Sequence, residues 1–356
     1  MRGKKCNFED RQTIDICKMI CALLVVSIHI RPFESFSKTL NFLEGDIIAR
    51  VAVPFFYASA SFFLFEKIIF SEKGKIVKCQ ENNSILLKYL SRIILLYIIW
   101  SGIYLFWQIP YWNSIGWTGV GAIIDYIVSF FVRGSVYHFW YFVSLIYGSI
   151  ILYKLLQILG IIKTFYISTF LYLLKSLIYG YSWLKIPGIE MAEKIWNMFS
   201  GVFDGVCLAL PFMVVGMLAS QKNSIYLKIS RYRKLGGVIS FCGLVIEASL
   251  LYFFGGNNGK YSYIIFTFPL CIFLFSCVLE KKMNIGINYS RRIRKYSTLV
   301  FCVHPLVIYF CQRSTFFNNF NSFFKYMCVS SISLLVSIII VLLIERRKYK
   351  LLTYLV

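Results

Sequence analysis

Residues 13–31 read TIDICKMICALLVVSIHIR, an almost unbroken apolar run. A helix that crosses a membrane needs about 20 mostly apolar residues, so this run predicts a transmembrane helix. The segment 120–132 is too short to cross and is expected to lie at the interface, or over a cavity, as an amphipathic helix. Nine further long runs follow the first one, at 48–70, 86–108, 136–156, 164–183, 200–220, 235–254, 261–280, 296–312 and 324–344. We therefore predict an all-α membrane protein with about ten transmembrane helices.

The composition of the whole chain agrees with this fold class. Of the 356 residues, 58% are hydrophobic and 15% are charged, whereas a soluble domain has about 45–50% apolar and about 25% charged residues. These values exclude a soluble enzyme, a disordered chain and a disulfide-stapled secreted scaffold. Because no loop is long enough for a separate soluble domain, residues 1–356 are expected to form one multi-pass domain in the plasma membrane.

The loop charges predict how the helices are oriented. If the N-terminus is cytoplasmic, the inner segments carry 27 of the 38 Lys and Arg residues and the outer loops carry 8, with Lys18, Arg50 and Lys175 inside spans. Basic loops stay on the cytoplasmic side, so we expect ten crossings with both termini in the cytoplasm. The same loops and their attraction to anionic lipids explain the net charge of +22. No nucleic-acid partner is expected.

Ionisable residues inside a span are candidate functional groups, because each costs several kcal/mol in the membrane when it lacks a partner. Lys18 and His29 are eleven residues apart, which places them on one helix face and about 16 Å apart along the axis. Lys18 lies toward the cytoplasm and His29 near the outer end. Taken singly, Lys18 could instead extend to the interface or pair with Asp15, and His29 could be an ordinary interfacial histidine.

Other basic residues lie at the predicted outer ends of later spans. Arg50 opens the second span, and His138 and Trp140 open the fourth. Together with His29 these groups would lie at one level and form a site for a polar acceptor or an anionic group. An arginine at the start of a span is alternatively an interface anchor.

The remaining polar residues of the spans suggest structure as much as function. His304 lies near mid-membrane next to Pro305, where a kink would free a carbonyl to line a cavity. Lys175 and Glu247 lie near mid-depth and are expected to form a salt bridge with each other. Most of the 11 cysteines lie in spans without a CxxC pair, so we expect small buried hydrophobic residues and no metal site.

Several strings of residues resemble segments of the bacterial acyltransferase 3 family of membrane O-acyltransferases. The string KMICALLVVSIH (18–29) is similar to the family's first-helix pattern of an Arg, ten residues and a His, with Lys18 in the place of the Arg. The string RVAVPFFYASASFFLF (50–65) resembles an Arg-x-x-x-Pro-Phe-Phe segment of the family. HFWYF (138–142) resembles its His-Leu-Trp segment at the fourth span.

The resemblance continues along the chain. PFMVVGMLAS (211–220) and STLVFCVHPLVI (297–308) also look like family segments, and the likeness covers roughly residues 11–345. Ala60 stands where the family has a glycine that permits close helix approach. The membrane half of the serine racemases of vancomycin resistance is similar in layout, although we recognise no racemase domain in these 356 residues.

The resemblance implies transfer of an acyl group, chiefly acetyl from acetyl-CoA, to a hydroxyl of an extracytoplasmic surface glycan or cell-envelope polysaccharide. Lys18 would hold the pantetheine or thioester end, or polarise the carbonyl, and basic cytoplasmic loops would receive the phosphates of CoA. His29 would act as general base or accept the acyl group transiently. Four residues would bind the acceptor: Arg50, His138, Trp140 and His304. Acyl-CoA, the glycan, the lipid bilayer and glycan-assembly proteins are the implied partners, with no permanently bound cofactor.

Two other functions stay open at the level of sequence. In a transporter or exporter, the same polar face would line a path for a small solute, a lipid-linked sugar or a polysaccharide. Inverted-repeat symmetry would favour that reading, and none is visible in the sequence. In a structural partner of a glycan-assembly complex without chemistry of its own, substitution of His29 would leave function intact.

Overall fold

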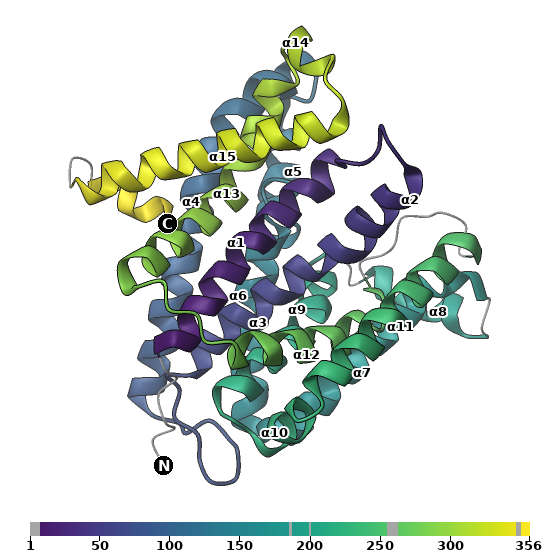
Figure 1. Cartoon of the computed structure of the whole chain (residues 1–356), viewed down its shortest axis with the longest axis vertical. Helices are drawn as coiled ribbons and strands as arrows, with labels where there is room; N and C mark the ends of the chain where they lie inside the picture. The colour runs from purple at the N-terminus through teal and green to yellow at the C-terminus, as the bar shows by residue number, and fades with distance from the viewer. Residues whose placement is uncertain (1–7, 185–186, 199–200, 255–262, 347–349) are drawn as a thin grey trace. The chain divides into compact units, whose positions relative to one another are not determined.

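Figure 1 shows the computed structural model, which describes residues 8–184, 187–198, 201–254, 263–346 and 350–356. These residues form helices joined by turns, with one isolated β-bridge between Phe70 and Ile76. The predicted all-α fold class is therefore confirmed. The α-helices are α1 (Phe8–Ile30), α2 (Lys38–Asn41), α3 (Ala52–Phe65), α4 (Gln80–Ser114), α5 (Gly119–Val132), α6 (Trp140–Ile158), α7 (Gly160–Gly180), α8 (Ile189–Met198), α9 (Val202–Ser220), α10 (Ser224–Ser230), α11 (Arg233–Phe254), α12 (Thr267–Glu280), α13 (Ile287–Cys311), α14 (Thr315–Asn318) and α15 (Ser322–Glu345). Shorter pieces are the π-helix η1 (Phe42–Ile48) and the 3-10 helices η2 (Ala49–Val51), η3 (Ser182–Leu184) and η5 (Lys350–Leu355).

Each of the ten predicted spans falls on a helix of its own, and the segment 120–132 forms α5. Among the described residues, seven helical segments are long and apolar enough to cross a membrane, or eight if α9 and α10, bent by 93°, form one span. The other two predicted spans correspond to α12, which has 14 residues, and α13, whose first turns carry four basic residues between 291 and 295. The membrane character is thus shown, whereas ten crossings with both termini inside stay a prediction.

The second predicted span, 48–70, differs from its expected form. Helix starts at Lys38, passes through η1 and η2, and continues as α3 to Phe65. Arg50 therefore lies inside a helical segment and does not open it. In the sequence the apolar run starts only at residue 48, because Glu44 and Asp46 precede it. In the structure Glu44 accepts a hydrogen bond from Ser27, and Asp46 pairs with two arginines. These partners compensate the two carboxylates, so the helix can begin before the apolar run does. A π-helix such as η1 is rare and frequently marks a functional site.

The chain divides into two compact units, which are described separately. The first unit comprises residues 60–221, with the end of α3 and helices α4 to α9. The second comprises the described residues of 4–59 and 222–356, with α1, η1, η2, the start of α3 and helices α10 to α15.

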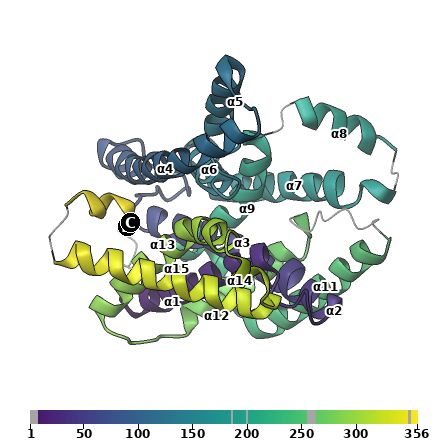
Figure 2. The ribbon, with the colours of Figure 1, turned by 90° about the horizontal axis from the view of Figure 1, so that it is seen from above.

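Small residues bring α6 and α9 of the first unit close together. A Cβ added at Gly205 would lie 2.7 Å from the Cβ of Ser144, and one at Gly148 would lie 3.4 Å from that of Ala209. Small residues four positions apart on each helix let two backbones approach within a membrane. Both pairs advance in the same direction, so α6 and α9 run parallel, as the predicted fourth and sixth spans would. Figure 2 shows α9 beside α6 and α7.

In the second unit, α1 packs along α13, which in turn packs against α15 (Figure 1). Asp15 hydrogen-bonds to Ser290 near the start of both helices, and His29 stacks on His304 further along. Each helix advances fourteen residues between the two contacts, about 21 Å. The helices are therefore parallel and in register, as expected of two spans that cross in the same direction.

Candidate functional site

One face of α1 carries both predicted catalytic residues. The helix is unbroken from Phe8 to Ile30, so Lys18 and His29 keep the one-face geometry expected from their spacing. At 100° per residue, the direction of Lys18 differs by about 60° from that of Asp15 and by about 20° from that of His29. Because Asp15 and His29 both contact α13, half-buried Lys18 lies on the α13-facing side of α1, between these two contacts.

The end of this face nearest the C-terminus of α1 holds a pair of histidines. The rings of His29 and His304 are stacked with centroids 5.3 Å apart and 26° between their planes. His29 is exposed, whereas His304 is completely buried and its Nδ1 lies 3.1 Å from the carbonyl oxygen of Val300. We infer that a neutral His304 ring carries its proton on Nδ1, because that nitrogen faces an acceptor. His304 was predicted to bind substrate, and its place behind His29 suits it equally to orient that ring.

A charged cluster lies in the turns that follow α1. Asp46 of η1 is buried, and its Oδ1 lies 3.3 Å from an Nη of Arg50 and 3.5 Å from an Nη of Arg31. Ser27 of α1 donates a hydrogen bond to Glu44, also of η1. Two guanidinium groups thus share one carboxylate, and a second carboxylate is tied to α1. Such an arrangement is suited to holding an anionic or polyhydroxylated group near the end of α1.

Sequence reasoning missed Arg31, Glu44 and Asp46, since it treated 32–47 as an outer loop. The available signal was Asp46 four residues before Arg50, a helical spacing for an ion pair. Arg31 has φ of 54°, in the left-handed region, and its N–H donates to the carbonyl of Ser27 at 2.8 Å. This is the αL ending of a helix, where glycine is usual. The ion pair with Asp46 helps to offset the steric cost of an arginine there.

His138 and Trp140 belong to the first unit. His138 is buried among aromatic rings, with centroids 4.1 Å from Phe139 and 5.4 Å from Tyr104, and half-buried Trp140 begins α6. Gly134, at φ of 97°, makes this turn possible because a Cβ there would lie 2.5 Å from the backbone nitrogen of Trp140. The four other predicted site residues, Lys18, His29, Arg50 and His304, all lie in the second unit.

The predicted pairing of Lys175 with Glu247 is wrong. Buried Lys175 forms an ion pair with Asp204 of α9, and its ammonium lies 3.2 Å from the ring centroid of Tyr179. Glu247 instead accepts hydrogen bonds from the backbone N–H groups of residues 265 and 266, at 2.7 and 2.9 Å, just before α12. Similar depth suggested a partner, but the turn before α12 has its own N–H groups to satisfy.

Among the described residues, no group of three or more His, Cys, Asp and Glu side chains is arranged to hold a metal ion.

Comparison with known proteins gives the following. A family model, acyltransferase 3, described as an acyltransferase domain, matches residues 11–344. The chain is 28% identical over 302 residues to an amino-acid racemase of Enterococcus faecalis, a match that covers 83% of this chain and 40% of the relative. It is 28% identical over 280 residues to a serine/alanine racemase of Enterococcus gallinarum, covering 75% and 37%. A second amino-acid racemase of Enterococcus faecalis is 26% identical over 353 residues, covering 96% and 46%. The chain thus spans less than half the length of these relatives, and no solved structure matches it.

Proposed function

The chain belongs to the acyltransferase 3 family, and on that premise we propose that it transfers acetyl from cytoplasmic acetyl-CoA to a hydroxyl of an extracytoplasmic glycan. The observation that carries this proposal is the polar face of α1, where Lys18 is followed by His29 with His304 stacked behind it. The family supports acyl transfer in a membrane protein. The acetyl group, the donor, the glycan and the plasma membrane are parts of the proposal.

The spacing along α1 favours one of two roles for Lys18. A thioester carbonyl within hydrogen-bond distance of His29 would be about 16 Å from the level of Lys18, which is farther than a lysine side chain reaches. Lys18 therefore holds the amide-rich pantetheine arm by charge-assisted hydrogen bonds and does not polarise the reacting carbonyl.

His29 serves as the general base in this mechanism. It takes the proton of the acceptor hydroxyl as the oxygen attacks the thioester carbonyl, so that a C–O bond forms. The C–S bond then breaks, and the CoA thiolate takes up the proton that His29 received. His304 keeps the imidazole of His29 in one orientation, which matters because misplacement by 1 Å can cost about 100-fold in rate.

The charged cluster beyond α1 is the proposed acceptor site. The Arg31 side chain is 44% exposed and approaches Asp46 with one nitrogen, and a guanidinium has further donors for hydroxyl or carboxylate oxygens of a glycan. His138 and Trp140 stay candidates for acceptor binding on the first unit.

The test is the amount of base-labile acetate on surface glycans of a deletion strain. Wild-type protein should restore acetate, and His29→Ala should not, at equal membrane levels on an immunoblot. Arg133→Ala is the matched control, because Arg133 is exposed and hydrogen-bonds to Ser129 of its own helical turn. Acetate that is unchanged by the deletion, or restored by His29→Ala, would contradict the proposal.

A second candidate is passage of a small amino acid through the same bundle. The observation in its favour is that the curated relatives are named racemases of amino acids. Uptake of radiolabelled serine and alanine by the deletion strain distinguishes the two functions. A loss of uptake with unchanged glycan acetate would favour transport, and Lys18 and His29 would then line the path.

A further inference from the structure

The turn that follows α1 is tied to the start of α15 by two serines. The hydroxyl of Ser322 donates a hydrogen bond to the carbonyl oxygen of Pro32 at 2.8 Å and accepts one from the backbone N–H of Ser35 at 3.0 Å. The N–H of Ser322 donates to the hydroxyl oxygen of Ser35 at 3.1 Å, and the two hydroxyl oxygens are hydrogen-bonded at 2.7 Å. These hydrogen bonds are called the clasp below, and they join residues 287 and 290 positions apart in the chain.

The clasp uses the full hydrogen-bonding capacity of the Ser322 hydroxyl. A serine hydroxyl has one donor position and two acceptor positions. Because the proton of Ser322 goes to Pro32, we infer that the hydroxyl of Ser35 is the donor between the two side chains. Replacement of Ser322 by alanine would therefore leave only the hydrogen bond from its backbone N–H to Ser35.

The turn needs such support because Arg31 has an unfavourable backbone conformation. Its φ is 54°, in the left-handed region, which costs free energy for a residue with a Cβ. The next residue is Pro32, and a proline favours an extended backbone, with φ of about −120°, in the residue before it. Two local preferences thus oppose this conformation, and such strain persists only where surrounding contacts hold it. The clasp binds the carbonyl of the residue directly after Arg31.

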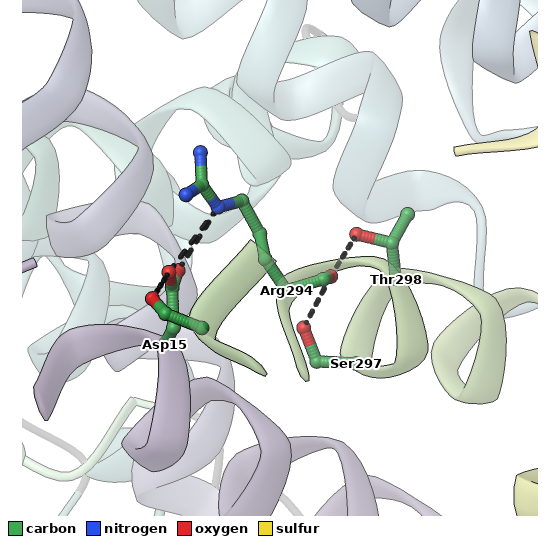
Figure 3. Close-up of polar contacts among 5 residues, drawn as sticks. Asp15, Arg294, Ser297 and Thr298 are labelled. Atoms are coloured by element: carbon green, nitrogen blue, oxygen red, sulfur yellow. Dashed lines mark hydrogen bonds and ion pairs between the residues drawn. The ribbon is translucent and has the colours of Figure 1, made fainter. Parts of the chain in front are cut away.

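The body of α1 is held by contacts other than the clasp. Toward its start, Asp15 pairs with Arg294 of α13 (Figure 3), and near its end His29 stacks on His304. Neither contact involves α15 or the turn after α1. Loss of the clasp is therefore expected to release the turn and to leave His29 in place.

Arg31 is the residue of the acceptor site whose position depends on this turn. Its side chain is 44% exposed, and its guanidinium lies 3.5 Å from Asp46 of η1, which is buried. Arg31 follows His29 by two residues, so their Cα atoms are at most about 7 Å apart. A sugar bound by the guanidinium can therefore place a hydroxyl within reach of the imidazole of His29.

We propose that Ser322, together with Ser35, is a positioning residue of the acceptor site: the clasp holds Arg31 in the conformation in which its guanidinium binds oxygens of the glycan beside His29. This inference rests on the proposed function. Ser322 touches neither donor nor acceptor in this mechanism and acts only through the turn. Its loss weakens acceptor binding and leaves donor binding and the chemical step unchanged.

Steady-state kinetics of the purified full-length protein in nanodiscs test this role. The donor is radiolabelled acetyl-CoA, and the acceptor is surface glycan extracted from the deletion strain. Ser322→Ala should raise KM for this glycan roughly tenfold, since a charged hydrogen-bond donor is no longer held toward the acceptor. The kcat and the KM for acetyl-CoA should stay within about twofold of the wild type. A KM for glycan equal to that of the wild type, or a loss confined to kcat, would overturn the proposal.

Asn321→Ala is the matched control at the adjacent position. The side chain of Asn321 caps α15 by accepting a hydrogen bond from the N–H of Phe324 at 2.8 Å, and it takes no part in the clasp. Its removal weakens the start of α15, so an effect caused only by local destabilisation would appear in this variant too. We expect its KM for glycan to stay within about twofold of the wild type. Equal increases in the two variants would overturn the proposal.

A clasp that can be opened and closed by redox chemistry tests the same point within one protein. Hydroxyl oxygens 2.7 Å apart place positions 35 and 322 within reach of a disulfide. In the double variant Ser35→Cys/Ser322→Cys, the oxidised protein should have the KM of the wild type, and reduction should raise it as Ser322→Ala does. Wild type given the same oxidant and reductant controls for the native cysteines. Equal KM values in both states would overturn the proposal, and so would a fall in kcat on oxidation, because the clasp would then have to open during turnover.

Chemical modification separates this inference from the proposed function. Phenylglyoxal modifies accessible arginines, which mass spectrometry locates. In Ser322→Ala, Arg31 should react roughly threefold faster than in the wild type because it leaves Asp46, while exposed Arg133 reacts at the same rate in both. An unchanged rate at Arg31 would overturn the proposal. If Arg31 responds but the wild type acetylates no glycan, the proposed function is wrong and the hold of the clasp on Arg31 stands. If glycan is acetylated with a KM that does not depend on the clasp, the reverse is true.

Discussion

Replacement of Asp204 by alanine would leave Lys175 in the interior of the first unit without its carboxylate. The Lys175 side chain is 1% exposed and that of Asp204 is 31% exposed. Breaking a buried pair by removing one partner costs about 3–5 kcal/mol. The rings of Tyr179 and Trp196, with centroids 3.2 and 4.7 Å from the ammonium, recover about 1 kcal/mol of this. We therefore expect Asp204→Ala to lower the free energy of unfolding by about 3 kcal/mol.

The partner variant should be milder. Lys175→Met leaves a carboxylate that is partly exposed and still accepts a hydrogen bond from the indole of Trp196 at 2.6 Å. Its cost is expected to be about 1 kcal/mol. The double variant should resemble Lys175→Met alone, because the stranded ammonium is gone, which gives a coupling energy of about 3 kcal/mol between the two sites.

The assay is reversible unfolding of the purified protein in mixed micelles, followed by tryptophan fluorescence. If Asp204→Ala destabilises the protein no more than Lys175→Met, the buried ammonium does not depend on this ion pair and the reasoning is refuted. Additive effects in the double variant would refute it as well.

Three further predictions concern single positions. His304→Ala should remove the stack on His29 and lower acetyl transfer by up to about 100-fold through misorientation of His29, and activity equal to the wild type at the same membrane level would contradict this. Arg31→Gly should be more stable than Arg31→Ala by about 1 kcal/mol in thermal melts, because the left-handed backbone suits glycine; the opposite order would show that φ is not retained. Gly205→Ala should cost about 1–3 kcal/mol because its Cβ would overlap α6. Gly102→Ala, with nothing within 4 Å of the added Cβ, should be neutral or stabilising, and equal melting temperatures for the two alanine variants would exclude the close contact of α6 and α9.

Most of the helices could be predicted because each is a long apolar run. The least predictable one is the helix that ends as α3, since Glu44 and Asp46 interrupt its apolar pattern and their partners lie on α1 or in the turn after it. When the hydrogen-bond or ion-pair partner of a polar residue lies far away in the sequence, the sequence alone suggests that the residue belongs to a loop. The same reason hid Arg31 from sequence reasoning.

The spacing of the candidate site residues along one helix was predictable from the sequence. Their contacts with residues of other helices were not. The eleven-residue spacing of Lys18 and His29 is a property of one helix, and α1 retains it. The stack of His29 on His304 joins residues 275 positions apart. The pattern of residues within either helix does not predict this contact with the other helix. Lys175 was assigned the wrong partner for a related reason: depth in the membrane is readable from the sequence, whereas the direction in which a helix faces its neighbours is not.

The sequence by itself therefore determined the membrane character, the helical class, the positions of the helices and the one-face placement of Lys18 and His29, because these follow from apolar run length and from 3.6 residues per turn. The tertiary structure alone decided that α1 and α13 are parallel and in register, that Asp15 pairs with Arg294, and that Asp204 pairs with Lys175. Those outcomes depend on which side chains must satisfy one another once water is excluded, and buried charge finds its partner in space regardless of distance along the chain.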